Sequence, residues 1–187
     1  MELTEREKKV LLSAARQSIK SFFEDTELLS PDFDTNPNLK LPLGAFVTLR
    51  IEEKLRGCIG YIVTQMTLFE TICEAAKQAA FRDPRFLPLM FEEFNKINIE
   101  ISVLSQPQKI NGYDEIIIGE HGLILQNGLS HAVLLPQVAV SNNFSREEFL
   151  AALCEKGGLK TDYWQNHKLN LKVFTAAIFS EDEWGKK

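Results

Sequence analysis

The sequence predicts an α+β fold in which helices flank a mainly antiparallel sheet. Two observations carry this prediction: the expected strands and helices do not alternate in strict βα order, and neighbouring strands are joined by short turns typical of hairpins. The chain has 187 residues, of which 44% are hydrophobic and 25% charged, which is an ordinary globular composition. This length suits one domain, or one domain with a small lobe.

Each predicted helix begins at a capping box, in which Ser or Thr is followed three residues later by Glu. The boxes pair Thr4 with Glu7, Thr67 with Glu70, and Ser145 with Glu148. Apolar residues at helical spacing extend these helices to about residue 24, to the loop at 81–86, and to about residue 156. Residues 25–43 contain three prolines and indicate a loop long enough to cover another part of the domain.

Strands are predicted where apolar and polar residues alternate. Residues 44–52 form the first strand, and the charged residues that follow turn the chain into a second strand containing Cys58. The register of this hairpin stays open, because a two-residue and a three-residue loop place Cys58 beside opposite faces of the first strand. Further strands are expected at 97–103, around 171–179, and on both sides of an Asn127-Gly128 turn, with a loop at 136–143.

Charge and cysteine usage exclude several classes of protein. The net charge of −5, without any cluster of Lys or Arg, disfavours nucleic-acid binding. No apolar stretch approaches the length of a membrane span and the N-terminus lacks a signal-peptide pattern, so we expect a cytoplasmic protein outside the membrane. Cys58, Cys73 and Cys154 form no CxxC pair and should be reduced; the last two lie in apolar helix stripes and are interpreted as core residues.

The stretch Leu55–Tyr61 is the candidate functional site, because it combines a cation, a thiol and two glycines. Alternation places Arg56 and Cys58 on one face of a strand, while Gly57 and Gly60 lower the wall of side chains beside them. A guanidinium near a thiol favours the thiolate, which is the nucleophilic form.

Two interpretations of Cys58 stay open. As a nucleophile or carrier it would use Arg56 to favour the thiolate or to bind an anionic group, with Asp83 or Arg85 organising the rim. As a packing residue it would let backbones approach closely beside glycine. An arginine at such a position needs a carboxylate or an anion, and Asp83 and Glu100 are candidate partners by residue type.

No local pattern supplies the other parts of a known catalytic centre. A cysteine nucleophile normally has a histidine base, and none of His121, His131 and His167 is marked by its surroundings. Pairs with metal-ligand spacing are missing from the sequence. The glycines at 57 and 60 do not complete GxGxxG, and GxxxxGK[ST] does not occur, so we expect neither a metal nor a nucleotide cofactor.

The hexapeptide Leu55–Gly60 resembles the signature of the AMMECR domain family. Segments similar to that family follow in the same order, at 79–80, 83–86, 99–105, 134–139, 149–150, 156–159 and Trp164, so the resemblance spans nearly the whole chain. Two segments depart from it: Gly157 stands where the family commonly has alanine, and the residues around His131 differ, which makes His131 a poor candidate for a shared base.

The resemblance implies one AMMECR-like domain over residues 1–187, with a larger and a smaller subdomain and the hexapeptide in a cleft of the larger one. Similar proteins are associated with a Memo-like protein and a radical S-adenosylmethionine protein, which gives two candidate partners. We therefore expect either an enzyme or enzyme component centred on Cys58 and Arg56, or a binding module for a partner protein or a small anionic ligand. The expected binding residues are Gly57, Gly60, Asp83, Arg85 and Glu100.

Overall fold

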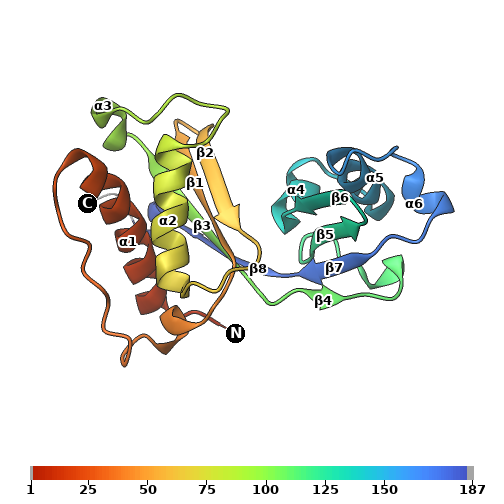
Figure 1. Ribbon diagram of the computed structural model, residues 1–187, viewed down its shortest axis with the longest axis horizontal. Coiled ribbons are helices and arrows are strands. Elements are labelled where there is room, and N and C mark those ends of the chain that lie inside the picture. Colours follow the sequence, from red (N-terminus) through yellow and green to blue (C-terminus); the bar gives the residue numbers. More distant parts are fainter. Residues whose placement is uncertain (1, 185–187) are drawn as a thin grey trace. The chain divides into compact units, whose positions relative to one another are not determined.

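The computed structural model describes residues 2–184, which fall into two compact units (Figure 1). The first unit runs up to Leu104 and resumes at Ala177, whereas Ser105–Ala176 form the second. The first unit is therefore discontinuous in sequence, with the second unit inserted before its last strand.

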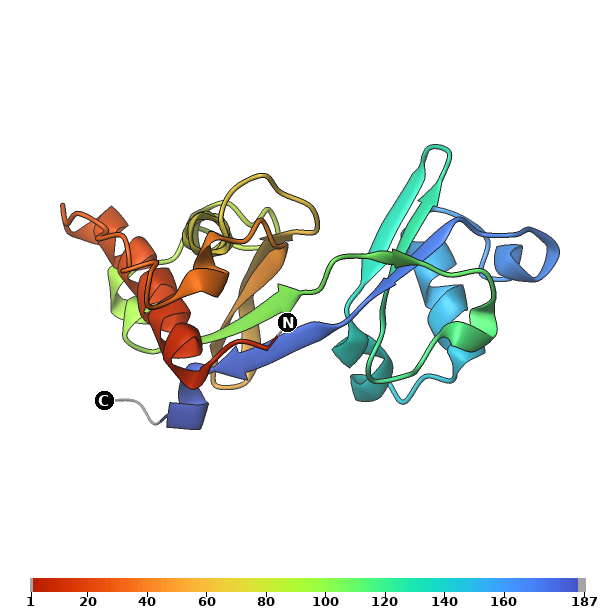
Figure 2. The same cartoon turned by 90° about the horizontal axis from the view of Figure 1, so that it is seen from below.

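The first unit consists of two long helices on one face of a four-stranded sheet, an arrangement visible in Figure 1. The sheet has the order β2-β1-β3-β8, and β1 pairs antiparallel with both β2 and β3. Figure 2 shows β3 and β8 side by side. The elements are α1 (Glu5–Phe23), β1 (Ala45–Ile51), β2 (Lys54–Tyr61), α2 (Leu68–Phe81), α3 (Phe91–Phe94), β3 (Asn98–Leu104) and β8 (Ala176–Ser180), with 3-10 turns at Pro37–Lys40 and Glu181–Trp184.

Local sequence signals account for most of this unit. Thr4 and Thr67 each cap a helix through the predicted box, with the side chain accepting a hydrogen bond from the third backbone N–H. On the sheet, alternate residues of β1 such as Val47 and Leu49 are fully buried against the helices. Burial of these apolar side chains supplies the main driving force for packing the helices onto the sheet.

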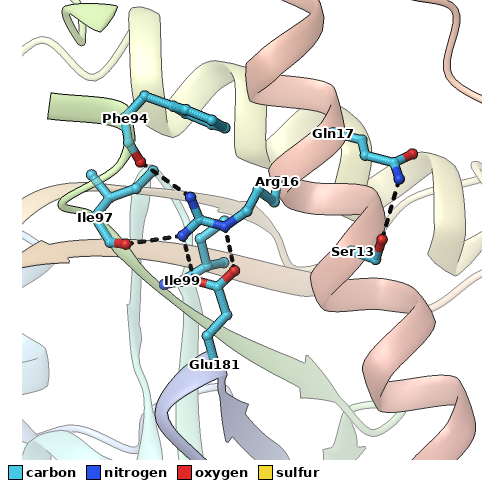
Figure 3. A network of polar contacts seen from close by, with 7 residues as sticks. All are labelled: Ser13, Arg16, Gln17, Phe94, Ile97, Ile99 and Glu181. Carbon is cyan, nitrogen blue, oxygen red and sulfur yellow. Dashed lines mark hydrogen bonds and ion pairs between the residues drawn. The ribbon is translucent and has the colours of Figure 1, made fainter. Parts of the chain in front are cut away.

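Arg16 of α1 ties the helix layer to the end of the sheet through a polar network (Figure 3). Its guanidinium forms two bonds of 2.5 Å with the carboxylate of Glu181. It also donates to the carbonyl oxygens of Phe94 at 3.1 Å and Ile97 at 2.9 Å. Glu181 in turn accepts from the backbone N–H of Ile99 at 2.9 Å, so one ion pair connects α1, β3 and the chain segment after β8.

The second unit is a smaller sheet of order β4-β7-β5-β6, whose pairings are antiparallel, with helices packed against it. Phe149 and Leu153 of its longest helix are fully buried in its separate core. The elements are β4 (Gln108–Lys109), a 3-10 turn (Tyr113–Glu115), β5 (Gly122–Asn127), β6 (Ser130–Leu134), α4 (Pro136–Ser141), α5 (Arg146–Lys156), α6 (Tyr163–Asn166) and β7 (Leu171–Phe174).

Three sequence predictions for this part of the chain are wrong in detail. Residues 136–141, predicted as a loop, form α4, because proline is well tolerated in the first turn of a helix. The β5–β6 hairpin is present, but its two-residue turn is Gly128-Leu129 rather than Asn127-Gly128, and Gly128 supplies the positive φ of 62°. The expected last strand divides into β7 and β8, which belong to different sheets.

Within the part of the chain that is described, no helix combines the length and the apolar character needed to span a bilayer.

Candidate functional site

Cys58 lies on β2, which is the edge strand of the first sheet. The β1–β2 turn contains only Glu52 and Glu53, both at positive φ (49° and 63°), as in a type I′ hairpin. A β-bulge then shifts the register between Leu49 and Arg50, so that Thr48 pairs with Cys58. Without that extra residue the same turn would pair Thr48 with position 57 and direct Cys58 toward the helix layer. The bulge thus answers the open question of register and sets the direction of the thiol.

The thiol of Cys58 has a polar partner on the paired strand, because the Thr48 hydroxyl donates a hydrogen bond to Cys58 Sγ at 3.3 Å. Thr48 is 6% exposed, whereas Cys58 is half-buried. Thr48 is not among the residues predicted from the sequence, since only the strand register places it opposite Cys58. A hydroxyl donor stabilises the thiolate form of the sulfur.

The outer edge of β2 is closed by two side chains of the loop after α2. The carboxylate of Asp83, a residue only 3% exposed, accepts a hydrogen bond from the backbone N–H of Cys58 at 2.9 Å. Arg85 Nη2 donates to the carbonyl oxygen of Cys58 at 3.2 Å. Together they satisfy the two backbone groups that a neighbouring strand would otherwise bind.

Asp83 and Arg85 are also held by each other. Arg85 reaches Asp83 through Nη2–Oδ2 at 2.7 Å and Nε–Oδ1 at 2.9 Å, and its backbone N–H donates to Oδ1 at 3.1 Å. The bonds from Arg85, followed by those from the two backbone N–H groups, lower the pKa of Asp83 to about 2 despite its burial. The pKa of Arg85 is raised, first by Asp83 and also by the neighbouring Cys58. Asp83 is therefore ionised at neutral pH.

Arg56 is the bulged residue, and its carboxylate partner is Glu93 rather than either residue proposed from the sequence. Arg56 Nε and Nη2 each lie 2.8 Å from an oxygen of Glu93, in a bidentate pair, and Nη2 also donates to the carbonyl of Pro88 at 3.4 Å. Arg56 lowers the pKa of Glu93. The third guanidinium nitrogen, Nη1, is buried and has no partner among the described residues. The hydrogen bonds of Arg56 thus hold the loop that follows α2.

The two glycines of the hexapeptide allow close approach of other backbone. A Cβ atom at Gly57 would lie 2.1 Å from the carbonyl oxygen of Ala79 in α2. One at Gly60 would lie 2.3 Å from the carbonyl oxygen of Ala45 and 2.5 Å from the ring of Phe46. Both positions therefore require glycine for packing, and Gly57 brings β2 directly against α2.

Glu100 lies on β3 opposite Thr48 of β1. Cys58, Thr48 and Glu100 therefore occupy neighbouring positions in a row across three strands, where side chains on one face interact. Glu100 is partly exposed, and its strand β3 lies in the interior of the sheet between β1 and β8. This row places an acid two strands from the thiol.

The remaining candidates lie elsewhere. His121, His131 and His167 all belong to the second unit, so the unit that carries Cys58 contains no imidazole. Cys73 and Cys154 are buried, and burial raises the pKa of both thiols. Among residues 2–184, no group of three His, Cys, Asp or Glu side chains could hold a metal ion.

Comparison with known proteins identifies the family. The AMMECR1 family model matches residues 12–179. Protein Mbar_A1807 of Methanosarcina barkeri is 39% identical over 189 residues, which is 97% of this chain and 93% of that protein. Protein PF1979 of Pyrococcus furiosus is 39% identical over 182 residues, 92% of this chain and 87% of that protein. The crystal structure of the uncharacterized protein PH0010 from Pyrococcus horikoshii has a TM-score of 0.88 and 35% identity, covering 97% of this chain and 95% of that one. The chain belongs to the AMMECR1 family.

Proposed function

We propose that the protein is an enzyme or enzyme component in which Cys58 acts as a nucleophile or covalent carrier. The observation that carries this proposal is the support of one half-buried thiol from two sides, by Thr48 at the sulfur and by Asp83 and Arg85 at the peptide groups. Reactive cysteines are found in partly exposed places beside cations and hydrogen-bond donors, whereas structural cysteines are sealed in apolar cores.

The proposed step begins when the Cys58 thiol loses its proton to solvent. The thiolate then uses an electron pair to form a bond to an electrophilic carbon, and the leaving group departs with the electrons of the broken bond. Solvent receives the proton in this scheme because the first unit offers no imidazole. The half-exposed guanidinium of Arg85 would bind an anionic part of the substrate beside Cys58.

Alkylation with iodoacetamide at neutral pH, followed by peptide mass spectrometry, tests this proposal. Cys58 should react faster than Cys73 and Cys154, which serve as internal controls because burial raises their pKa values. Equal or slower labelling of Cys58 in the folded protein would contradict the proposal.

A variant separates activation of the thiol from simple exposure. Thr48→Val keeps the shape of the side chain but removes the hydroxyl donor. It should slow alkylation of Cys58 about two- to three-fold, because the sulfur loses the hydrogen-bond donor that orients it for attack. Thr161→Val, at an exposed threonine in the second unit, is the matched control and should leave the rate unchanged. An unchanged rate in Thr48→Val would show that the hydroxyl does not activate the sulfur.

The second candidate function is a binding module for a partner protein or a small anionic ligand. It is favoured by the half-exposed guanidinium of Arg85 beside Cys58, and by Arg56, whose bonds to Glu93 and Pro88 hold the loop that carries Arg85. In that case Arg56→Ala should weaken binding, whereas Cys58→Ser should leave it intact. The opposite pattern would favour the enzyme.

The proposed partners are a Memo-like protein and a radical S-adenosylmethionine protein, and the proposed compartment is the cytoplasm. Support for the partners comes from the association of similar proteins with them, and support for a reducing compartment comes from the three free cysteines. Affinity purification of the tagged protein from its own cells tests the partners. Recovery of neither partner, under conditions that keep the folded chain intact, would count against them.

A further inference from the structure

The second unit contains a pocket of about 380 Å³, which is independent of the Cys58 site. It lies between the segment 110–113 and the segment 164–171, and all the residues that line it belong to the second unit. The volume falls within the range of about 300–1,000 Å³ that is typical of small-molecule sites.

Two aromatic rings contribute to the wall of this pocket. The rings of Tyr113 and Trp164 meet edge to face, with centroids 5.9 Å apart and planes at 82°. Such an arrangement forms a corner in which a flat ring can stack on one aromatic side chain and contact the edge of the other. The pocket is therefore shaped for a planar group.

The Tyr113 hydroxyl fixes the position of the opposite segment. It accepts a hydrogen bond from the backbone N–H of Leu169 at 3.1 Å and lies 3.5 Å and 3.4 Å from the carbonyl oxygens of Trp164 and His167. The ring of His167, which also lines the pocket, stacks on Tyr163 with the ring centroids 4.1 Å apart. The wall is thus held in place before any ligand binds.

The polar side chains of the pocket are mostly exposed amides and one cation. Asn111, Gln165 and Asn166 each offer both a donor and an acceptor, and Lys168 contributes a positive charge. No aspartate or glutamate lines the pocket. The nearby Glu115 carboxylate accepts instead from the backbone N–H groups of residues 111 and 112, at 2.8 and 3.0 Å. The pocket therefore combines one cation, several amide groups and no lining anion.

We propose that this pocket binds a small aromatic acid, with the ring against Tyr113 and Trp164 and the carboxylate directed to Lys168 and the indole N–H. The ring shape follows from the aromatic corner. The negative charge follows from Lys168, which is not balanced by any aspartate or glutamate among the lining residues. This site does not depend on the proposed chemistry of Cys58. A result that contradicts one of the two proposals therefore leaves the other unaffected.

Tryptophan fluorescence provides the test, because the chain contains only two tryptophans. In a Trp184→Phe background the signal comes from Trp164 alone. Benzoate is the probe, with benzamide as its neutral counterpart and cyclohexanecarboxylate as an acid without an aromatic ring. We expect a saturable change with benzoate in the millimolar range and at least several-fold weaker binding of the other two compounds.

Charge variants complete the experiment. Lys168→Gln should weaken benzoate binding several-fold and reduce its dependence on salt, whereas Lys156→Gln, an exposed lysine outside the pocket, should change neither. Cys58→Ser should bind benzoate as well as the parent chain does. A non-saturating change with benzoate, equal binding of all three probes, or equal affinity in the Lys168→Gln and Lys156→Gln variants would overturn the proposal.

Discussion

Replacing Asp83 with asparagine removes one negative charge from the edge of β2 while keeping the shape of the side chain. Asp83 is 3% exposed and accepts four hydrogen bonds, from the backbone N–H groups of Cys58 and Arg85 and from two nitrogens of the Arg85 guanidinium. Asparagine has a single acceptor oxygen, so several of these donors would lose their partner. We expect the first unit to be destabilised.

The pKa of Asp83 gives the size of the effect and its dependence on pH. One pKa unit corresponds to about 1.4 kcal/mol. The folded state lowers this pKa from 3.8 to about 2, which corresponds to roughly 2–3 kcal/mol of stability. Since the folded pKa is the lower one, this stability is fully present above pH 3.8 and is lost as the pH falls toward 2.

Urea unfolding between pH 7 and pH 2, followed by the fluorescence of Trp184 in a Trp164→Phe background, measures the difference. The free energy of unfolding of Asp83→Asn should fall roughly 2–3 kcal/mol below that of the parent at neutral pH, and the gap should close toward pH 2. Asp25→Asn, at an exposed position, should show little change at any pH. A gap that stays constant across the range would refute the role assigned to the ionised carboxylate.

Two further predictions concern packing and charge in the same unit. Gly57→Ala should destabilise the protein by about 3 kcal/mol in urea unfolding, because the new methyl group would overlap the backbone of α2. Gly128→Ala is the control, because the new methyl group would meet no atom there and only the positive φ of 62° disfavours alanine; it should cost about 1 kcal/mol. Equal losses of stability in Gly57→Ala and Gly128→Ala would argue against the overlap with α2. Arg56→Met and Glu93→Met should each lower the free energy of unfolding by about 2 kcal/mol. The double variant should lose at least about 1 kcal/mol less than the sum of the two single losses, because each single variant leaves the other charge without its partner. Strict additivity in that double-mutant cycle would mean that the bidentate pair contributes no coupling.

The sequence predicted the elements that depend on local signals. The capping threonines and serine placed the starts of α1, α2 and α5 correctly, because a cap and its helix are only three residues apart. Alternation placed β1 and β3, whose buried faces follow from the period of a strand. Family membership was also predicted, from the hexapeptide and the segments that follow it.

The geometry around Cys58 depended on long-range packing and could not be predicted. The bulge at Arg56 arises where β2 lies against α2, and no residue of the β1–β2 turn predicts it. Glu93 is 37 residues from Arg56, on a helix of four residues that no capping signal in the sequence had marked. Thr48 likewise became a candidate only when the register was known. Asp83 and Arg85 were identified, but their contact with the backbone of Cys58 was not.

The discontinuity of the first unit has a consequence for how the protein is made. The ribosome releases α1, α2 and the strands β1, β2 and β3 first, then the whole of the second unit, and only afterwards β8. Until β8 emerges, the outer edge of β3 has no partner and could pair with another chain. Glu181, which binds Arg16, follows β8 directly and is synthesised with the same late segment. Nascent chains halted before residue 176 should therefore be more prone to aggregate than the finished protein.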